Sequence, residues 1–120
     1  MLIKHLSACP EFIAGDKTLL RELLHPANDK TAIRYSLAHS IVKAGNSSVA
    51  HSLKTTEVYY ILEGTGIMHI NDETAAVAPG DAVYIPPNAV QYIENTGTGD
   101  LKFLCVVDPA WRKEDENITQ

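Results

Sequence analysis

The chain has 120 residues, of which 45% are hydrophobic and 21% are charged, and these proportions indicate a single globular domain. Its formal net charge of −5 and its lack of a Lys/Arg run argue against nucleic acid and anionic membranes as partners, because both require a basic surface. No apolar segment reaches the roughly 18 residues of a membrane-spanning helix. The first residues make a poor signal peptide, and the two cysteines lack a paired spacing, so a cytoplasmic location is predicted.

The predicted elements begin with a short strand within residues 1–15, before an Ala-Gly-Asp turn at 14–16. Residues 17–25, KTLLRELLH, have a helix-forming composition, and Asp16 would cap two turns of helix. An extended segment is the alternative for this stretch. A turn at 26–29 then leads into a strand over residues 31–43.

The strand at 31–43 alternates between two kinds of side chain. One face carries a mostly apolar row that is expected to point into the fold: Ile33, Tyr35, Leu37, His39 and Ile41. The other face is then expected to meet solvent or a second layer, and it carries Arg34, Ser36, Ala38 and Ser40. His39 is either a buried neutral histidine bonded to a polar neighbour, or a ligand or acid/base group that lines a pocket.

Further short strands are expected after residue 64, each ended by a turn signal. They cover residues 67–70, 74–78, 82–85, 90–94 and 101–107. Many short strands separated by turns predict a sandwich or a barrel. The tail after Asp108-Pro109 is expected to form a solvated short helix or a frayed end, with Trp111 packed on the fold or against a second subunit.

Two stretches, residues 45–64 and 80–95, carry polar side chains at even spacings along predicted strands. Glu57 and Tyr59 share a strand face, and His51 stands six residues before Glu57. An imidazole and a carboxylate that converge inside a small barrel can ligate a metal ion. The spacing alone leaves open that the pair is unrelated and that Glu57 is solvated.

The same two stretches resemble the two sequence motifs of the cupin family, in its small single-domain form. The first motif, G-x5-H-x-H-x3,4-E-x6-G, is matched by Gly45, His51, Glu57 and Gly64, with Leu53 in place of the second histidine. The second motif, G-x5-P-x-G-x2-H-x3-N, is matched by Gly80, Pro86 and Asn95, with Asn88 and Gln91 at the other positions. Seven of the ten named positions agree.

This resemblance implies an all-β fold, a double-stranded β-helix or jelly-roll barrel, in one domain. Residues 1–30 would supply an N-terminal strand segment, 31–108 the barrel core and 109–120 a tail. The resemblance also favours a strand over a helix at 17–25. It further implies a homodimer that forms through terminal strands and one sheet.

In cupins that bind metal, the two histidines and the glutamate of the first motif and the histidine of the second hold the ion. The resemblance therefore carries over His51 and Glu57 as ligands, whereas Leu53 cannot ligate and Gln91 offers only an amide oxygen. This oxygen-rich set with one negative charge suits Mn, Fe(II), Mg or Ca better than a thiolate-type zinc site. The divalent ion is expected to be Mn, Fe or Ni and not Zn.

Two functions fit these residues. The first is a metal-dependent enzyme on a small polar substrate, of the dioxygenase, decarboxylase or sugar-isomerase type, in which His39 or Tyr59 moves protons. The second is a ligand-binding or sensing cupin with a degenerate, metal-free site. In both, a small molecule occupies a cavity that Tyr35, Tyr59 and Tyr84 are expected to line.

Overall fold

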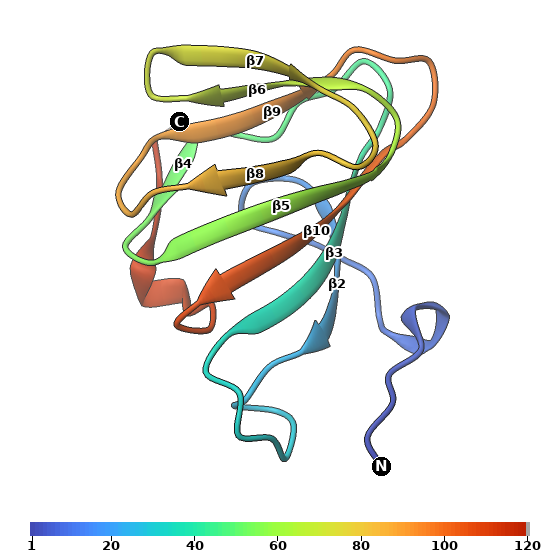
Figure 1. The fold of residues 1–120 in the computed structure, drawn as a ribbon, viewed down its shortest axis with the longest axis vertical. Helices are drawn as coiled ribbons and strands as arrows, with labels where there is room; N and C mark the ends of the chain where they lie inside the picture. The colour runs from blue at the N-terminus through green and yellow to red at the C-terminus, as the bar shows by residue number, and fades with distance from the viewer. Residues whose placement is uncertain (120) are drawn as a thin grey trace.

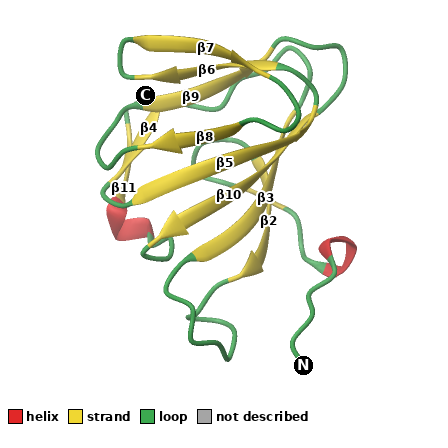
Figure 2. Cartoon of the chain, viewed as in Figure 1, coloured by secondary structure: helices red, strands yellow, loops and turns green. Residues whose placement is uncertain are grey.

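The computed structural model of the protein describes residues 1–119, which form two antiparallel sheets folded into a jelly-roll barrel (Figures 1 and 2). The larger sheet contains, in spatial order, β1 (Phe12–Ile13), β2 (Leu19–Leu24), β3 (Ser36–Val42), β10 (Leu101–Asp108), β5 (Thr56–Glu63) and β8 (Ala82–Ile85). The smaller sheet contains β11 (Glu116–Ile118), β4 (His51–Leu53), β9 (Gln91–Asn95), β6 (Gly66–Ile70) and β7 (Glu73–Val77). Two short 3₁₀ turns are η1 (Leu6–Ala8) and η2 (Lys113–Asp115). None of the helices within residues 1–119 is long and apolar enough to cross a membrane.

The central strand of the larger sheet is β10, which pairs with β3 on one side and β5 on the other. Its alternation is the one predicted: Leu101, Phe103, Cys105 and Val107 are buried, and the residues between them are only partly covered. Because directly opposed residues of antiparallel strands share a sheet face, β10 determines which residues of β3 and β5 point inward.

Two terminal segments illustrate how strand pairing decides local structure. Residues 17–25, whose composition also suits a helix, contain strand β2, which pairs along β3, so the predicted strand is confirmed. Asp16 accepts hydrogen bonds from the backbone N–H and hydroxyl of Thr18, which fixes the turn before that strand. The tail contains the short turn η2, but the prediction missed strand β11, which pairs with β4.

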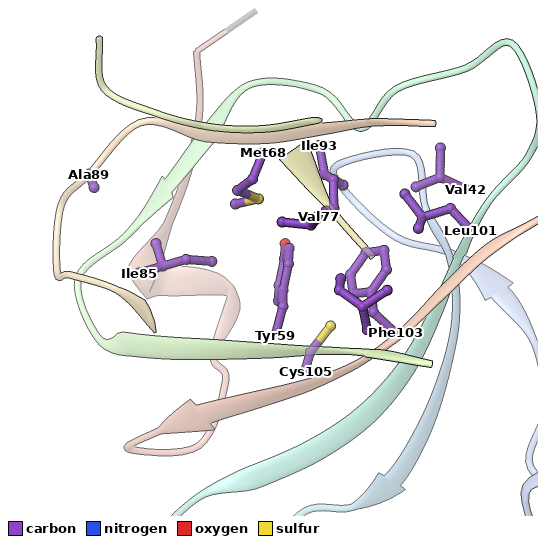
Figure 3. Close-up of a cluster of buried hydrophobic side chains, with 11 residues drawn as sticks. Val42, Tyr59, Met68, Val77, Ile85, Ala89, Ile93, Leu101, Phe103 and Cys105 are labelled. Atoms are coloured by element: carbon purple, nitrogen blue, oxygen red, sulfur yellow. The ribbon is translucent and has the colours of Figure 1, made fainter. Parts of the chain in front are cut away.

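The hydrophobic core lies between the two sheets (Figure 3). Met68 and Ile93 from the smaller sheet face Tyr59 and Phe103 from the larger one, and the rings of Tyr59 and Phe103 have centroids 4.4 Å apart. His69 lies on the other face of β6, where it pairs with Glu94 and stacks on Tyr92. Most core residues therefore come from β5 to β10, whereas β1 to β4 contribute mainly to a cavity.

Candidate functional site

A cavity of about 110 Å³ lies between the two sheets. Its walls come from β1 to β5, from β10 and β11, and from the turn before β2. The apolar part of its lining is Phe12, Ala14, Gly15, Leu20, Ala38, Leu53, Tyr59, Cys105, Val107 and Trp111. The polar part is Asp16, Glu22, Ser36, Ser40, His51, Glu57 and Glu116. A mostly apolar hollow with a few converging polar groups is the usual form of a small-molecule site.

His51 opens strand β4 and is only 2% exposed. Its Nδ1 lies 2.7 Å from the backbone carbonyl of Val49. Because a carbonyl oxygen can only accept, Nδ1 carries the hydrogen, and the neutral ring therefore has its lone pair on Nε2. Nε2 lies 3.7 Å from Oδ2 of Asp16, which is too long for a direct hydrogen bond. The Val49 contact thus orients the imidazole and leaves Nε2 available to a ligand.

Glu57, Gln91 and Tyr59 form a hydrogen-bonded chain in the barrel interior. The Tyr59 hydroxyl donates to Oε1 of Gln91 over 3.0 Å, and Nε2 of Gln91 donates to Oε1 of Glu57 over 2.8 Å. Burial raises the pKa of Glu57 to about 8, against the opposing effect of the Gln91 hydrogen bond. Glu57 is therefore largely a neutral acid at pH 7, and its second oxygen has no hydrogen-bond partner among residues 1–119.

The polar wall of the cavity includes two acidic residues near His51 that the sequence analysis did not place in a site, Asp16 and Glu116. A Cβ built on Gly15 would stand 2.8 Å from Oε1 of Glu116, so the Glu116 carboxylate packs directly over Gly15 and beside Asp16. Burial raises the pKa of Glu116, and nearby His51 opposes that rise. Asp16 is a turn residue and Glu116 lies in the charged tail, and neither belongs to a motif, so no local signal marks them.

The prediction that the row containing His39 faces the interior is wrong. Ser36, Ala38 and Ser40 line the cavity instead, because they oppose Val107, Cys105 and Phe103 of β10, whose side chains point inward. His39 lies on the outer face of the sheet, opposite Arg21 of β2 and Leu104 of β10. It is buried there, which lowers its pKa, and its Nδ1 has no hydrogen-bond partner within residues 1–119.

The three tyrosines expected around the cavity are separated by the fold. Tyr59 is buried and lines the cavity. Tyr35 precedes β3 and is 38% exposed, and Tyr84 is 61% exposed because Ile85 takes the inward position of β8. The expectation for Tyr35 and Tyr84 is therefore wrong. Trp111, which was expected to pack on the fold or a second subunit, lines the cavity, and its backbone N–H donates to the Ser36 hydroxyl.

The proposed metal ligands His51, Glu57 and Gln91 lie close together, since His51 opposes Gln91 in the β4–β9 pairing and Gln91 bonds Glu57. Their lone pairs do not converge, however. The amide oxygen of Gln91 already accepts the Tyr59 hydrogen, and the side that faces Glu57 is the NH₂ donor. Within residues 1–119, no three His, Cys, Asp or Glu side chains are grouped so that they could hold a metal ion. This donor set does not fit a preformed metal site.

Comparisons with known proteins agree with this architecture. The family model described as a cupin domain matches residues 38–107. An uncharacterized protein of Methanocaldococcus jannaschii is 42% identical over 110 residues, which are 91% of this chain and 87% of that protein. An oxalate-binding protein of Thermotoga maritima is 41% identical over 51 residues, 42% of each chain.

The fold itself recurs in solved structures. The crystal structure of a predicted oxalate decarboxylase from Thermotoga maritima superposes with a TM-score of 0.79 at 24% identity, covering 90% of this chain and 99% of that one. At this identity the likeness concerns the fold alone. The family model spans more than half of the chain. The two motif stretches lie on strands that pair with each other, β4 with β9 and β5 with β8. This chain is therefore a member of the cupin family.

Proposed function

We propose that this cupin binds a small polar organic molecule in the cavity between its sheets, and that its own side chains suffice for binding without a metal ion. The observation that carries the proposal is the cavity of about 110 Å³, into which the buried His51 and Glu57 present polar atoms. An apolar cavity of about 150 Å³ can hold benzene, so this one suits a ligand of roughly four to six non-hydrogen atoms.

The polar groups of the cavity are held in place before any ligand arrives. Val49 orients His51, Thr18 fixes the Asp16 carboxylate, and Gln91 holds one oxygen of Glu57. Groups that are already oriented cost little further ordering when a ligand binds. This arrangement supports recognition of a small molecule whose hydrogen-bonding groups match the cavity wall.

Titration of chelator-treated, isotope-labelled protein with small polar fragments tests this proposal by NMR. Bound fragments should shift the amide signals of His51 and Glu57. Ala38→Phe, which fills the cavity, should abolish those shifts, whereas Ala76→Phe on the exposed strand β7 should leave them. If no fragment moves these signals, or if Ala38→Phe binds as the parent does while remaining folded, the cavity is not a ligand site.

A metal-dependent enzyme is the second candidate, favoured by the orientation of His51. An imidazole whose Nδ1 donates to a backbone carbonyl presents Nε2 as a metal ligand would. The oxalate-binding protein of Thermotoga maritima is similar to this chain over a segment that is only 42% of its length. Near-stoichiometric Mn, Fe or Ni in protein purified without chelators, absent from a His51→Ala/Glu57→Ala variant, would replace the metal-free proposal by this one.

We also propose that the chain forms a homodimer through the outer face of β5 and β8. This face exposes Tyr60, Leu62 and Tyr84, and a two-fold interface can pair such a patch with its own copy. The parent should elute at about twice 13.1 kDa in size-exclusion chromatography with light scattering. Tyr84→Glu should shift it to the monomer, while Glu73→Lys on β7 should not. A monomeric parent at tens of micromolar contradicts this assembly.

A further inference from the structure

We propose that the cavity selects a small organic cation, a molecule that carries a protonated amine, over neutral and carboxylate-bearing molecules of the same size. This inference rests on the proposed ligand-binding function and names the class of ligand. It follows from the charges of the cavity wall, from the hydrogen-bonding groups that remain free there, and from the way the acidic residues are spread.

The charged side chains of the cavity wall are almost all acidic. Its ionisable side chains are the carboxyl groups of Asp16, Glu22 and Glu116, the largely protonated carboxyl of Glu57, and one imidazole, that of His51. No Lys or Arg side chain is among the lining residues within residues 1–119. A carboxylate ligand would lose its hydration and meet like charges without a counter-ion, which is strongly unfavourable in a partly enclosed site. A cation would instead be attracted by these carboxylates, and this attraction offsets the hydration that it loses.

The free atoms of the wall are hydrogen-bond acceptors, which is a separate observation. The Asp16 Oδ1 atom is occupied by Thr18, whereas its Oδ2 lies 3.7 Å from Nε2 of His51, too far for a bond between them. Since Nδ1 of the buried His51 donates to Val49, the ring in its neutral form presents Nε2 as an acceptor. Beside Oδ2 of Asp16, this form offers two acceptors with no donor between them, which match the N–H donors of a primary ammonium group.

An organic cation fits this wall better than a metal ion does. No three His, Cys, Asp or Glu side chains among the residues that the structure describes could hold a metal. Three aromatic side chains also line the cavity, Phe12, Tyr59 and Trp111. Aromatic rings attract ammonium groups and cover the apolar part of an organic ligand, which a bare ion lacks. The wall therefore suits a short chain with a charged end.

Three probes of matched shape test the inference by isothermal titration calorimetry on the chelator-treated parent protein at pH 7. Isopropanolamine is the cation, propylene glycol the neutral analogue and lactate the anion, and all three carry the same secondary hydroxyl. Isopropanolamine should bind at least about tenfold more tightly than propylene glycol, since charge-assisted hydrogen bonds exceed neutral ones. Lactate should bind more weakly than both.

A pair of variants assigns the selectivity to the cavity wall. Glu116→Gln should lower the affinity for isopropanolamine about tenfold and change the affinity for propylene glycol by less than about twofold. Glu114→Gln removes the same charge from an exposed residue two positions away and should change neither affinity. The ranking of probes on the parent does not depend on these variants, so the test stands even if one of them folds poorly.

The possible results separate this inference from the proposed function. Binding of all probes with propylene glycol or lactate at least as tight as isopropanolamine would overturn cation selection but keep a ligand-binding cavity. Equal weakening of isopropanolamine by Glu114→Gln and Glu116→Gln would also overturn it, because the attraction would then be a property of the whole negative surface. If Mg²⁺, Ca²⁺ or Mn²⁺ displaces bound isopropanolamine at a concentration below that of isopropanolamine, the preferred ligand is a metal ion and the inference is wrong. If no probe binds at all, the proposed function fails as well.

Discussion

Replacing Gln91 by leucine should lower the free energy of unfolding by about 2 to 4 kcal/mol, the largest loss we expect from a change of similar volume in this barrel. Gln91 is completely buried, and it is the only bridge described between the Tyr59 hydroxyl and the Glu57 carboxyl within residues 1–119. Leucine would leave both buried groups without these partners. Urea unfolding at pH 7 measures the loss, and the melting temperature should fall by roughly 10 °C.

A mutant cycle separates the loss of hydrogen bonds from a change in packing. Tyr59→Phe alone should cost about 1 kcal/mol, because Gln91 retains its bond to Glu57. The double variant Tyr59→Phe/Gln91→Leu should be less destabilised than the sum of the two single variants, since the hydroxyl that leucine would strand is already absent. A loss below about 0.5 kcal/mol for Gln91→Leu would show that this hydrogen-bonded chain contributes little to the stability of the barrel.

The stability of the parent protein should fall relative to that of Glu57→Gln as pH rises from about 4.5 to about 8. Glutamate ionises near pH 4.5 in the unfolded chain, whereas burial raises the pKa of Glu57 to about 8 in the fold. Between these values the folded state holds one proton more than the unfolded state, so raising the pH favours unfolding by about 1 kcal/mol per pH unit. The stabilisation of the fold by protonated Glu57 is fully present below about pH 4.5 and is lost above about pH 8.

Glu57→Gln removes the titration but keeps an oxygen that can accept the Gln91 hydrogen bond. The difference between the two stability curves therefore isolates Glu57 from other groups, such as His39, whose pKa burial lowers. Denaturant unfolding across this pH range, with a chelator present throughout, supplies the curves. The free energy of unfolding of Glu73→Gln, at an exposed position of β7, should change with pH in the same way as that of the parent. A pH-independent difference between the parent and Glu57→Gln would contradict a raised pKa.

The hydrogen bonds of Gln91 also explain how this barrel departs from the metal-binding pattern of its family. With an imidazole at position 91, the side chain would present a lone pair toward Glu57 and His51. The amide instead donates to Glu57 and accepts from Tyr59, so the interior is held together by neutral hydrogen bonds. The protonated Glu57 in this chain therefore needs no metal cation to offset a buried negative charge.

Much of the fold and part of the site could be predicted locally. The even spacing of Glu57 and Tyr59 placed both in the interior, and the two motifs brought His51, Glu57 and Gln91 together. The face of β3 could not be predicted in this way. Its outward row is more hydrophobic than its inward row, because Leu37 and Ile41 are partly covered on the outside while serines line the cavity.

By itself, the sequence determined where most of the strands lie, with β11 as an exception, and which family the barrel belongs to, because alternation, turn residues and motif spacing are properties of neighbouring residues. Only the tertiary structure decided that Asp16 and Glu116, a hundred positions apart, meet beside His51 and make the cavity wall acidic. It also decided that His39 lies outside the cavity and that the amide of Gln91 donates to Glu57. These outcomes depend on strand register and on the packing of two sheets. Both bring together segments whose contact no local sequence pattern indicates.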